Sequence, residues 1–213
     1  IVEPVQGEGG VIAAETEFLE RIRSLCDEHQ ALMILDEVQT GVGRTGSLYA
    51  YQAFNVIPDL LTTAKALGGG FPIAATLSSD KVAASLGVGT HGSTWGGNPM
   101  GCAVANVVLD IISAPAVLTG VSERRERLEA GILAIGQQYG VFEQVRGMGL
   151  LMGCVLAEPW TGRARDFMQA AQNEGLFVLV AGANVLRVAP SLIIPKDDID
   201  QGLARLQKAV EKI

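Results

Sequence analysis

Asp36 and Lys65 each stand at the end of a short apolar run in a chain of 213 residues. The runs, residues 31–35 and 60–63, have the length of strands that are buried on both faces of a parallel sheet. Open α/β sheets bind their ligands beyond the carboxyl ends of such strands. A lysine there can form a Schiff base with an aldehyde, and a carboxylate can keep a pyridine nitrogen protonated. The two residues therefore suit a pyridoxal phosphate enzyme, while their spacing alone favours a structural Asp–Lys ion pair at a sheet edge.

Two nucleotide-binding motifs overlap the same stretch, and each is incomplete. Residues 34–37 resemble a Walker B strand, but that interpretation requires a G-x-x-x-x-G-K-[ST] loop, and none of the five lysines follows a glycine. Residues 41–46 match G-x-G-x-x-G, the motif of dinucleotide-binding folds. Residues 37–40 separate these glycines from the strand, and the next acidic residue, Asp59, follows a proline. Both nucleotide-binding interpretations are therefore weak.

The first half of the chain alternates short apolar runs with amphipathic stretches, which predicts an α/β fold with a mostly parallel sheet. Thr16 can cap a first helix, and Asn98 with Pro99 can open another that ends near residue 112. The apolar positions of the first helix share one face: Phe18, Ile22, Leu25 and Cys26. The predicted strands cover residues 31–35, 60–63 and 73–77, with a glycine turn at 68–70.

The second half predicts a separate α+β arrangement. A charged helix runs from about Pro115 to Tyr139, and a helix over 164–173 stops at Gly175, a residue type that commonly follows helix ends. The last helix has its apolar residues on one face: Ile199, Leu203, Leu206 and Val210. The predicted strands flank residues 146–149 and cover 177–180 and 185–188.

These elements predict two domains, residues 1–114 and residues 115–213. Residues 1–4 have the composition of the middle of a buried strand. We therefore expect the chain to be a fragment of a longer protein.

Composition excludes several classes of protein. A net charge of −7 and a pI near 4.9 disfavour a protein that binds nucleic acid or a membrane surface. The three cysteines form no C-x-x-C pair, which favours a reducing, cytoplasmic compartment. Two histidines leave little scope for a zinc site, so we expect no metal. No run approaches the length of a membrane span.

Five blocks, in the expected order, resemble the class III (ornithine-type) aminotransferases. They cover residues 3–10, 35–41, 43–46, 63–72 and 91–99. The resemblance extends along the whole chain and is strongest to the acetylornithine and succinylornithine branch, of which residues 146–150 and 186–192 are typical. It implies a fold-type I architecture, in which residues 1–114 are the later part of the large cofactor-binding domain and residues 115–213 are the small C-terminal domain.

The resemblance assigns four residues to pyridoxal phosphate. Lys65 would hold the cofactor covalently and, once released by substrate, carry a proton between the substrate and the cofactor. Asp36 would be the partner of the pyridine nitrogen. Gln39 would donate a hydrogen bond to the phenolic oxygen, and Val38 would pack on one face of the ring.

Ser93 and Thr94 resemble residues that reach the cofactor phosphate of the neighbouring subunit in a homodimer. Their structural alternative is a polar turn that precedes the helix at Asn98. Trp95 departs from the family, in which a tyrosine is usual after the serine and threonine. The indole of Trp95 can still stack but lacks that hydroxyl.

Arg187 resembles the arginine that binds a substrate α-carboxylate, a role that suits a planar donor of two parallel hydrogen bonds. Glu8 matches the glutamate that pairs with it. Glu8 would neutralise Arg187 while the amine donor is bound and would release it for glutamate. Without the resemblance, both residues would be interpreted as surface charges.

The resemblance implies transfer of the δ-amino group of N-acetylornithine or N-succinylornithine to 2-oxoglutarate, in a cytoplasmic homodimer of arginine metabolism. Ornithine or 4-aminobutyrate stays open as the amine donor. A fragment that keeps only a dimerisation surface is the alternative from another class, although it would not need Lys65 or Asp36. We expect the chain by itself to be inactive, because the family's phosphate-binding glycine loop and second carboxylate-binding arginine precede the matching blocks.

Overall fold

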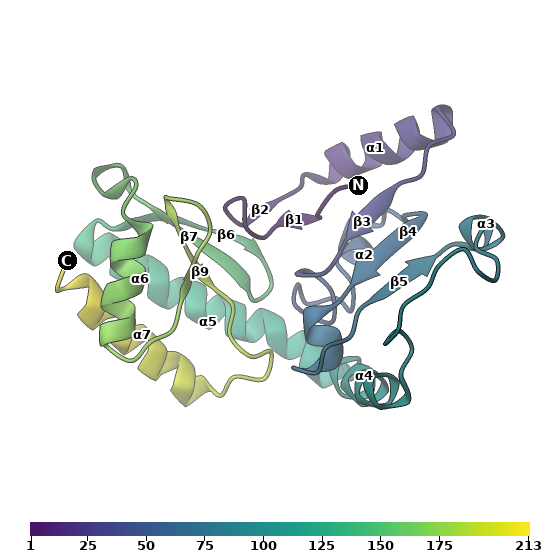
Figure 1. Ribbon diagram of the computed structural model, residues 1–213. Helices are drawn as coiled ribbons and strands as arrows, with labels where there is room; N and C mark the ends of the chain where they lie inside the picture. The colour runs from purple at the N-terminus through teal and green to yellow at the C-terminus, as the bar shows by residue number, and fades with distance from the viewer. The chain divides into compact units, whose positions relative to one another are not determined.

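The computed structural model describes residues 1–213, which form two compact units (Figure 1). The first unit contains residues 1–4 and 14–118, and the second contains residues 5–13 and 119–213. Each unit has its own sheet, helices and apolar core, so each is described by itself.

The sheet of the first unit has three strands in the order β3-β4-β5 (Figure 1). They are β3 (Ile34–Asp36), β4 (Leu60–Thr63) and β5 (Ala75–Ser78). β3 and β4 are parallel, whereas β4 and β5 are antiparallel. Val2 adds a parallel bridge to Leu35. The unit therefore has the predicted α/β character, built on a mixed sheet.

The helices of the first unit are α1 (Thr16–Glu28), α2 (Tyr51–Phe54), the 3₁₀ helix η1 (Lys65–Gly68), α3 (Asp80–Ala83) and α4 (Pro99–Ile112). α4 begins as predicted, because the Asn98 side chain accepts the N–H of Gly101 at 2.8 Å and Pro99 occupies the first turn. The predicted start of α1 is wrong by one residue. Glu15 is the N-cap, Thr16 is already helical, and no side chain caps this end.

The buried side of α1 also differs from the prediction. Leu19 is fully buried, whereas Phe18 is half exposed. The periodicity of apolar residues identified the helix but not its most buried residue, because the packing of the helix against the unit decides its rotation.

The core of the first unit joins the loop after β3 to β4, η1 and α4. Its buried residues are Val42, Tyr49, Leu61, Leu67 and Ala105, with partly buried side chains of α4 packed against them. Full burial of one such large apolar side chain contributes about 1.5–3 kcal/mol. This cluster fixes the segments on both sides of Lys65.

The second unit contains an antiparallel sheet in the order β6-β7-β9-β8. Its strands are β6 (Phe142–Met148), β7 (Leu151–Leu156), β8 (Leu179–Val180) and β9 (Val185–Val188). Its helices are α5 (Pro115–Tyr139), which starts at the end of the first unit, the 3₁₀ helix η2 (Glu158–Trp160), α6 (Ala164–Asn173) and α7 (Lys196–Val210). Gly175, with φ 73°, follows α6 as predicted.

A short hairpin of β1 (Val5–Gln6) and β2 (Ile12–Ala13) completes the second unit. Val5 and Val11 are fully buried in one cluster with Leu151, Ala181 and Val185. Residues 5–13 therefore pack with the C-terminal half of the chain, and the second division between the units falls after residue 118.

No single helix is both long and apolar enough to cross a membrane. α4 and α5 satisfy the length and composition criteria only when they are taken together.

Candidate functional site

Asp36 and Lys65 occupy the same edge of the sheet in the first unit. Asp36 is the last residue of β3 and pairs in register with Thr62 of the parallel neighbour β4. Lys65 begins η1, directly after β4 and Ala64. The carboxylate and the amine thus follow the carboxyl ends of two adjacent parallel strands, where open α/β sheets bind ligands.

The carboxylate of Asp36 is held by two donors. Its Oδ1 accepts the N–H of Val38 at 3.0 Å and the hydroxyl of Thr62 at 3.2 Å, and the residue is half-buried. A carboxylate offers about four acceptor positions, so two donors leave capacity for the N–H of a ligand. The structure therefore orients this acid without using all of its hydrogen-bonding capacity.

Lys65 has a backbone torsion φ of 45°, in the left-handed region. A side chain with a Cβ is uncommon there, and such strain costs about 1–3 kcal/mol and persists only where the surrounding structure imposes it. Buried Leu67 and Gly68 anchor the rest of η1, while Lys65 itself is exposed. The turn thus places Lys65 just beyond the carboxyl end of β4, exposed to solvent.

Glu37, next to Asp36, has a different role that the sequence did not reveal. It is only 1% exposed and accepts the N–H groups of Ala50 at 2.6 Å and Tyr51 at 2.9 Å, together with the Thr40 hydroxyl at 3.0 Å. Burial raises the pKa of this carboxyl, although the three hydrogen bonds that it accepts act to lower it. Glu37 fixes the loop after β3 to the start of α2.

The loop fixed by Glu37 carries the half-buried residues Val38 and Gln39. Val38 contributes its N–H to Asp36, so the same loop orients the carboxylate and exposes two predicted cofactor contacts. No motif pointed to Glu37 as an anchor. The only available signal was a second acid directly after the strand.

Ser93 and Thr94 lie exposed in the turn before α4. Ser93 Oγ accepts the N–H of Gly96 at 3.0 Å, and the Asn98 side chain donates to the Trp95 carbonyl at 3.0 Å. The indole of Trp95 is also exposed. Within this chain the segment is a polar turn that leads into α4, and its side chains face solvent.

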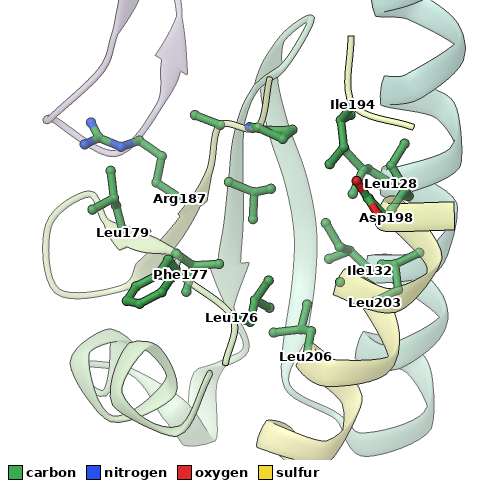
Figure 2. Close-up of a pocket in the computed structure, with 16 residues that line it drawn as sticks. Leu128, Ile132, Leu176, Phe177, Leu179, Arg187, Ile194, Asp198, Leu203 and Leu206 are labelled. Atoms are coloured by element: carbon green, nitrogen blue, oxygen red, sulfur yellow. The ribbon is translucent and has the colours of Figure 1, made fainter. Parts of the chain in front are cut away.

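Arg187 and Glu8 meet in the second unit. The Nη1 of Arg187, on β9, donates to Glu8 Oε1 at 2.7 Å and to the Gly7 carbonyl at 3.0 Å. Figure 2 shows the Arg187 side chain extending away from the strand toward the hairpin loop. The side chain of Arg187 is 10% exposed, whereas that of Glu8 is 70% exposed. The pair therefore joins an almost buried cation to an acid that water can reach.

An apolar cavity of about 180 Å³ lies in the second unit between α5, α7 and the chain around β8 and β9 (Figure 2). Leu128, Ile132, Leu203 and Leu206 contribute to its walls. Arg187 borders it, but its guanidinium points to the hairpin rather than inward. With few polar groups, this cavity is not where proton transfer chemistry would occur.

The structure thus groups the predicted site residues in two sets. The first unit contains Asp36, Val38, Gln39 and Lys65 around one sheet edge, and it also carries the turn of Ser93 and Thr94. The second unit contains the paired Glu8 and Arg187.

Residues 1–210 match the family model of class-III aminotransferases. The chain is 58% identical over 210 residues to an acetylornithine aminotransferase of Pseudomonas putida, covering 99% of this chain and 52% of that protein. It is 56% identical to a succinylornithine transaminase of Yersinia enterocolitica, covering 100% of this chain and 51% of that protein. The chain spans about half the length of the curated relatives it matches.

Solved structures of similar proteins have the same architecture. A crystal structure of N-acetylornithine aminotransferase from Stenotrophomonas maltophilia matches with a TM-score of 0.92 at 45% identity, covering 99% of this chain and 55% of that one. An ornithine aminotransferase from Toxoplasma gondii matches with a TM-score of 0.90 at 31% identity, covering 99% and 50%. These matches confirm the predicted fold class.

Proposed function

The chain belongs to the class III aminotransferases, and from this membership we propose that the full-length protein transfers the δ-amino group of N-acetylornithine or N-succinylornithine to 2-oxoglutarate. The observation that supports it best is the placement of Asp36 and Lys65 at the carboxyl edge of one parallel strand pair. That arrangement provides a carboxylate and an amine, the two groups that pyridoxal phosphate chemistry needs from the protein.

The residues of the first unit fit pyridoxal phosphate. When bound, this cofactor supplies an aldehyde that condenses with amines and a pyridinium ring that withdraws electrons. Asp36, held by Val38 and Thr62, has acceptor capacity left for the pyridinium N–H. Gln39 would donate to the phenolic oxygen, and Val38 would pack on the ring.

Lys65 would serve as both anchor and proton carrier. Its exposed amine would hold the aldehyde group of the cofactor covalently. Once released by substrate, Nζ would carry a proton from the substrate carbon that bears the amine to the cofactor. The left-handed turn at Lys65 keeps the amine at the sheet edge during these steps.

Arg187 and Glu8 would let one site accept two different substrates. Arg187 is largely buried and binds the α-carboxylate of glutamate or 2-oxoglutarate once Glu8 has moved away. When the acylated ornithine is bound, Glu8 returns and neutralises the guanidinium. The high exposure of Glu8 supports this exchange, because its carboxylate can be solvated when it leaves.

We further propose a cytoplasmic homodimer in which Ser93 and Thr94 bind the cofactor phosphate of the neighbouring subunit. The exposure of both residues in the turn before α4 supports this arrangement.

The alternative amine donors are ornithine and 4-aminobutyrate. The acylated donors are favoured, because relatives named for them are 50–58% identical, whereas solved structures named for ornithine aminotransferases are 30–32% identical.

The test is the absorbance of the full-length protein with pyridoxal phosphate, wild type beside Lys65→Ala. We expect a band near the visible edge in the wild type that is absent from the variant and that N-acetylornithine bleaches. Rates with acetylated, succinylated and free ornithine then identify the donor. The same band in both proteins, or in neither, would refute the role of Lys65.

A further inference from the structure

We propose that Arg146 is a positioning residue that sets how firmly Glu8 is held against Arg187. It acts through the turn of residues 7–11, which connects β1 to β2 and carries Glu8. The proposal rests on the proposed function, because it takes from there the role of the Glu8–Arg187 pair in substrate exchange.

The turn has an unusual backbone. Gly10 has φ 110° and Val11 has φ 55°, both in the region that side chains with a Cβ rarely adopt. A β-branched residue such as Val11 is a clear outlier there. Backbone strain of this kind persists only where the surrounding structure imposes it, and it gathers at functional sites.

Two glycines on the adjacent strands leave room for the side chain of Val11. Val11 is fully buried, and a Cβ added to Gly147 would lie 2.7 Å from its Cγ1. A Cβ added to Gly153 would lie 2.8 Å from the Cβ of Val11. Two glycines on the neighbouring strands β6 and β7 therefore leave room for this one side chain, which anchors the end of the turn.

Arg146, on β6, holds the adjacent residue. Its Nε donates to the Gly10 carbonyl at 2.9 Å, and a Cβ on Gly10 would lie 2.7 Å from its Nη2. The guanidinium thus lies against the backbone at Gly10, a position whose φ of 110° favours glycine. At the other end of the turn, Arg187 donates to the Gly7 carbonyl at 3.0 Å.

Glu8 lies between these two tethered carbonyls. Its side chain is exposed, so its contact with Arg187 depends on the conformation of the turn rather than on packing around the carboxylate. Release of the Gly10 end would let Glu8 spend less time against Arg187. The reaction with an acylated ornithine, in which Glu8 must neutralise Arg187, would become slower. The rate of the reaction with glutamate, in which Glu8 must leave, would not decrease.

The experiment compares Arg146→Leu and Arg146→Lys in the full-length protein with pyridoxal phosphate. Single-turnover rates are measured separately with N-acetylornithine and with glutamate, and hydrogen exchange is followed for residues 5–13. We expect the ratio of the two apparent second-order rate constants, N-acetylornithine over glutamate, to fall about tenfold in Arg146→Leu, the effect of losing one charge-assisted hydrogen bond. Exchange in the turn should become faster. Arg146→Lys, which retains a cationic donor, should lie between this variant and the wild type.

The matched control is Arg124→Leu. Arg124 is also half-buried in the second unit, and its Nε also donates to a backbone carbonyl, that of Ile194, at 2.9 Å. This variant should leave both the ratio and the exchange of the turn unchanged.

Two results would overturn the proposal: an equal loss of both reactions in the Arg146 variants, or unchanged exchange in residues 5–13. If Arg146→Leu fails to fold, Arg146→Lys supplies the same comparison. A wild-type protein that reacts with neither substrate would instead refute the proposed function. In that case hydrogen exchange would still decide whether Arg146 holds the turn.

Discussion

Lys65 in the first unit and Val11 in the second both have left-handed backbone torsions, φ 45° and 55°, but they are used differently. At Lys65, the strained residue itself carries the amine that we propose to react. At Val11, the strained residue is buried, and the group of interest is the exposed Glu8, three residues earlier in the same turn. A rigid turn can therefore display a reactive group directly, or it can position one at a distance from the strain.

The two regions also differ in how far apart in sequence their partners are. Asp36 Oδ1 is held by Val38, two residues away, and by Thr62 on the adjacent strand. Glu8 and Arg187 are separated by 179 positions. Errors in the packing of the second unit should therefore impair the Glu8–Arg187 pair before they affect the edge of β3 and β4.

The largest effect is expected from Lys65→Ala in the full-length protein. Loss of the amine removes both the covalent anchor and the proton carrier, so single-turnover transfer should fall by about a thousandfold or more. The control is Lys81→Ala, an exposed lysine of α3, which should keep the wild-type rate. A Lys65→Ala protein that retained a tenth of the activity would contradict the assignment.

Asp36→Asn should have the next largest effect. Asparagine retains an oxygen for the Val38 N–H and the Thr62 hydroxyl, so the fold should persist. It loses the charge that stabilises a protonated ring nitrogen, and kcat should fall by about a hundredfold. Circular dichroism checks the fold and single-turnover kinetics check the rate, with exposed Asp110→Asn on α4 as the control. If Asp36→Asn kept the kcat of the wild type, the proposed role of Asp36 at the ring nitrogen would be wrong, and Asp36 would be a structural residue.

Arg187→Lys tests recognition in the second unit. Lysine keeps the charge but loses the planar pair of donors, so kcat/KM for glutamate should fall by about ten- to a hundredfold. Arg205→Lys, whose exposed arginine donates to the Gly175 carbonyl, should change neither substrate constant. If Arg187→Lys raised the KM for N-acetylornithine and left glutamate unaffected, the carboxylate assignment would be wrong.

Gly153→Ala should lower the stability of the second unit, which contains Val11. The new Cβ would meet the Cβ of Val11 at 2.8 Å and Val185 Cγ1 at 3.0 Å, and overpacking of this kind costs about 1–3 kcal/mol in the free energy of unfolding. Denaturant unfolding measures that loss. Gly87→Ala, with no heavy atom within 4 Å of its added Cβ, is the control.

The same Gly153→Ala protein should keep the absorbance band that depends on Lys65, because that lysine belongs to the first unit. Its ratio of N-acetylornithine to glutamate reactivity should decrease, since displacement of Val11 disturbs the turn that carries Glu8. If the band were lost and the reactivity ratio stayed unchanged, the substitution would act on the Lys65 site rather than on the turn that carries Glu8, and the prediction would be wrong.

The smallest effect concerns pH and Glu37. Burial raises the pKa of Glu37 above the ordinary value of 4.5, so ionising this carboxyl costs more in the folded state than in the unfolded one. The stability that this difference contributes is fully present below pH 4.5 and is lost as pH rises through the folded-state pKa. The wild type should therefore lose stability relative to Glu37→Gln as pH rises from 4.5. Parallel Tm curves for the two proteins across that window would contradict this linkage.

Local sequence predicted the elements whose ends have strong chemical signals. Asn98 and Pro99 fixed the start of α4, and Gly175 marked the end of α6, because capping and helix termination depend on a few adjacent residues. The start of α1 lacked such a signal. Thr16 resembled a cap, but the backbone enters the helix one residue earlier, at Glu15, and no side chain caps it.

The sequence alone determined that this is an α/β chain with an aspartate and a lysine at the ends of two apolar strands, and the resemblance carried by its motifs determined the family. Only the tertiary structure decided that Glu37 anchors a loop while its neighbour Asp36 keeps acceptor capacity, and that residues 5–13 pack in the second unit. The physical reason is the sequence separation over which the interactions act. Strand propensity and capping act between close residues, whereas the burial of Glu37 and the hydrogen bond from Arg146 to the Gly10 carbonyl exist only once the chain has folded.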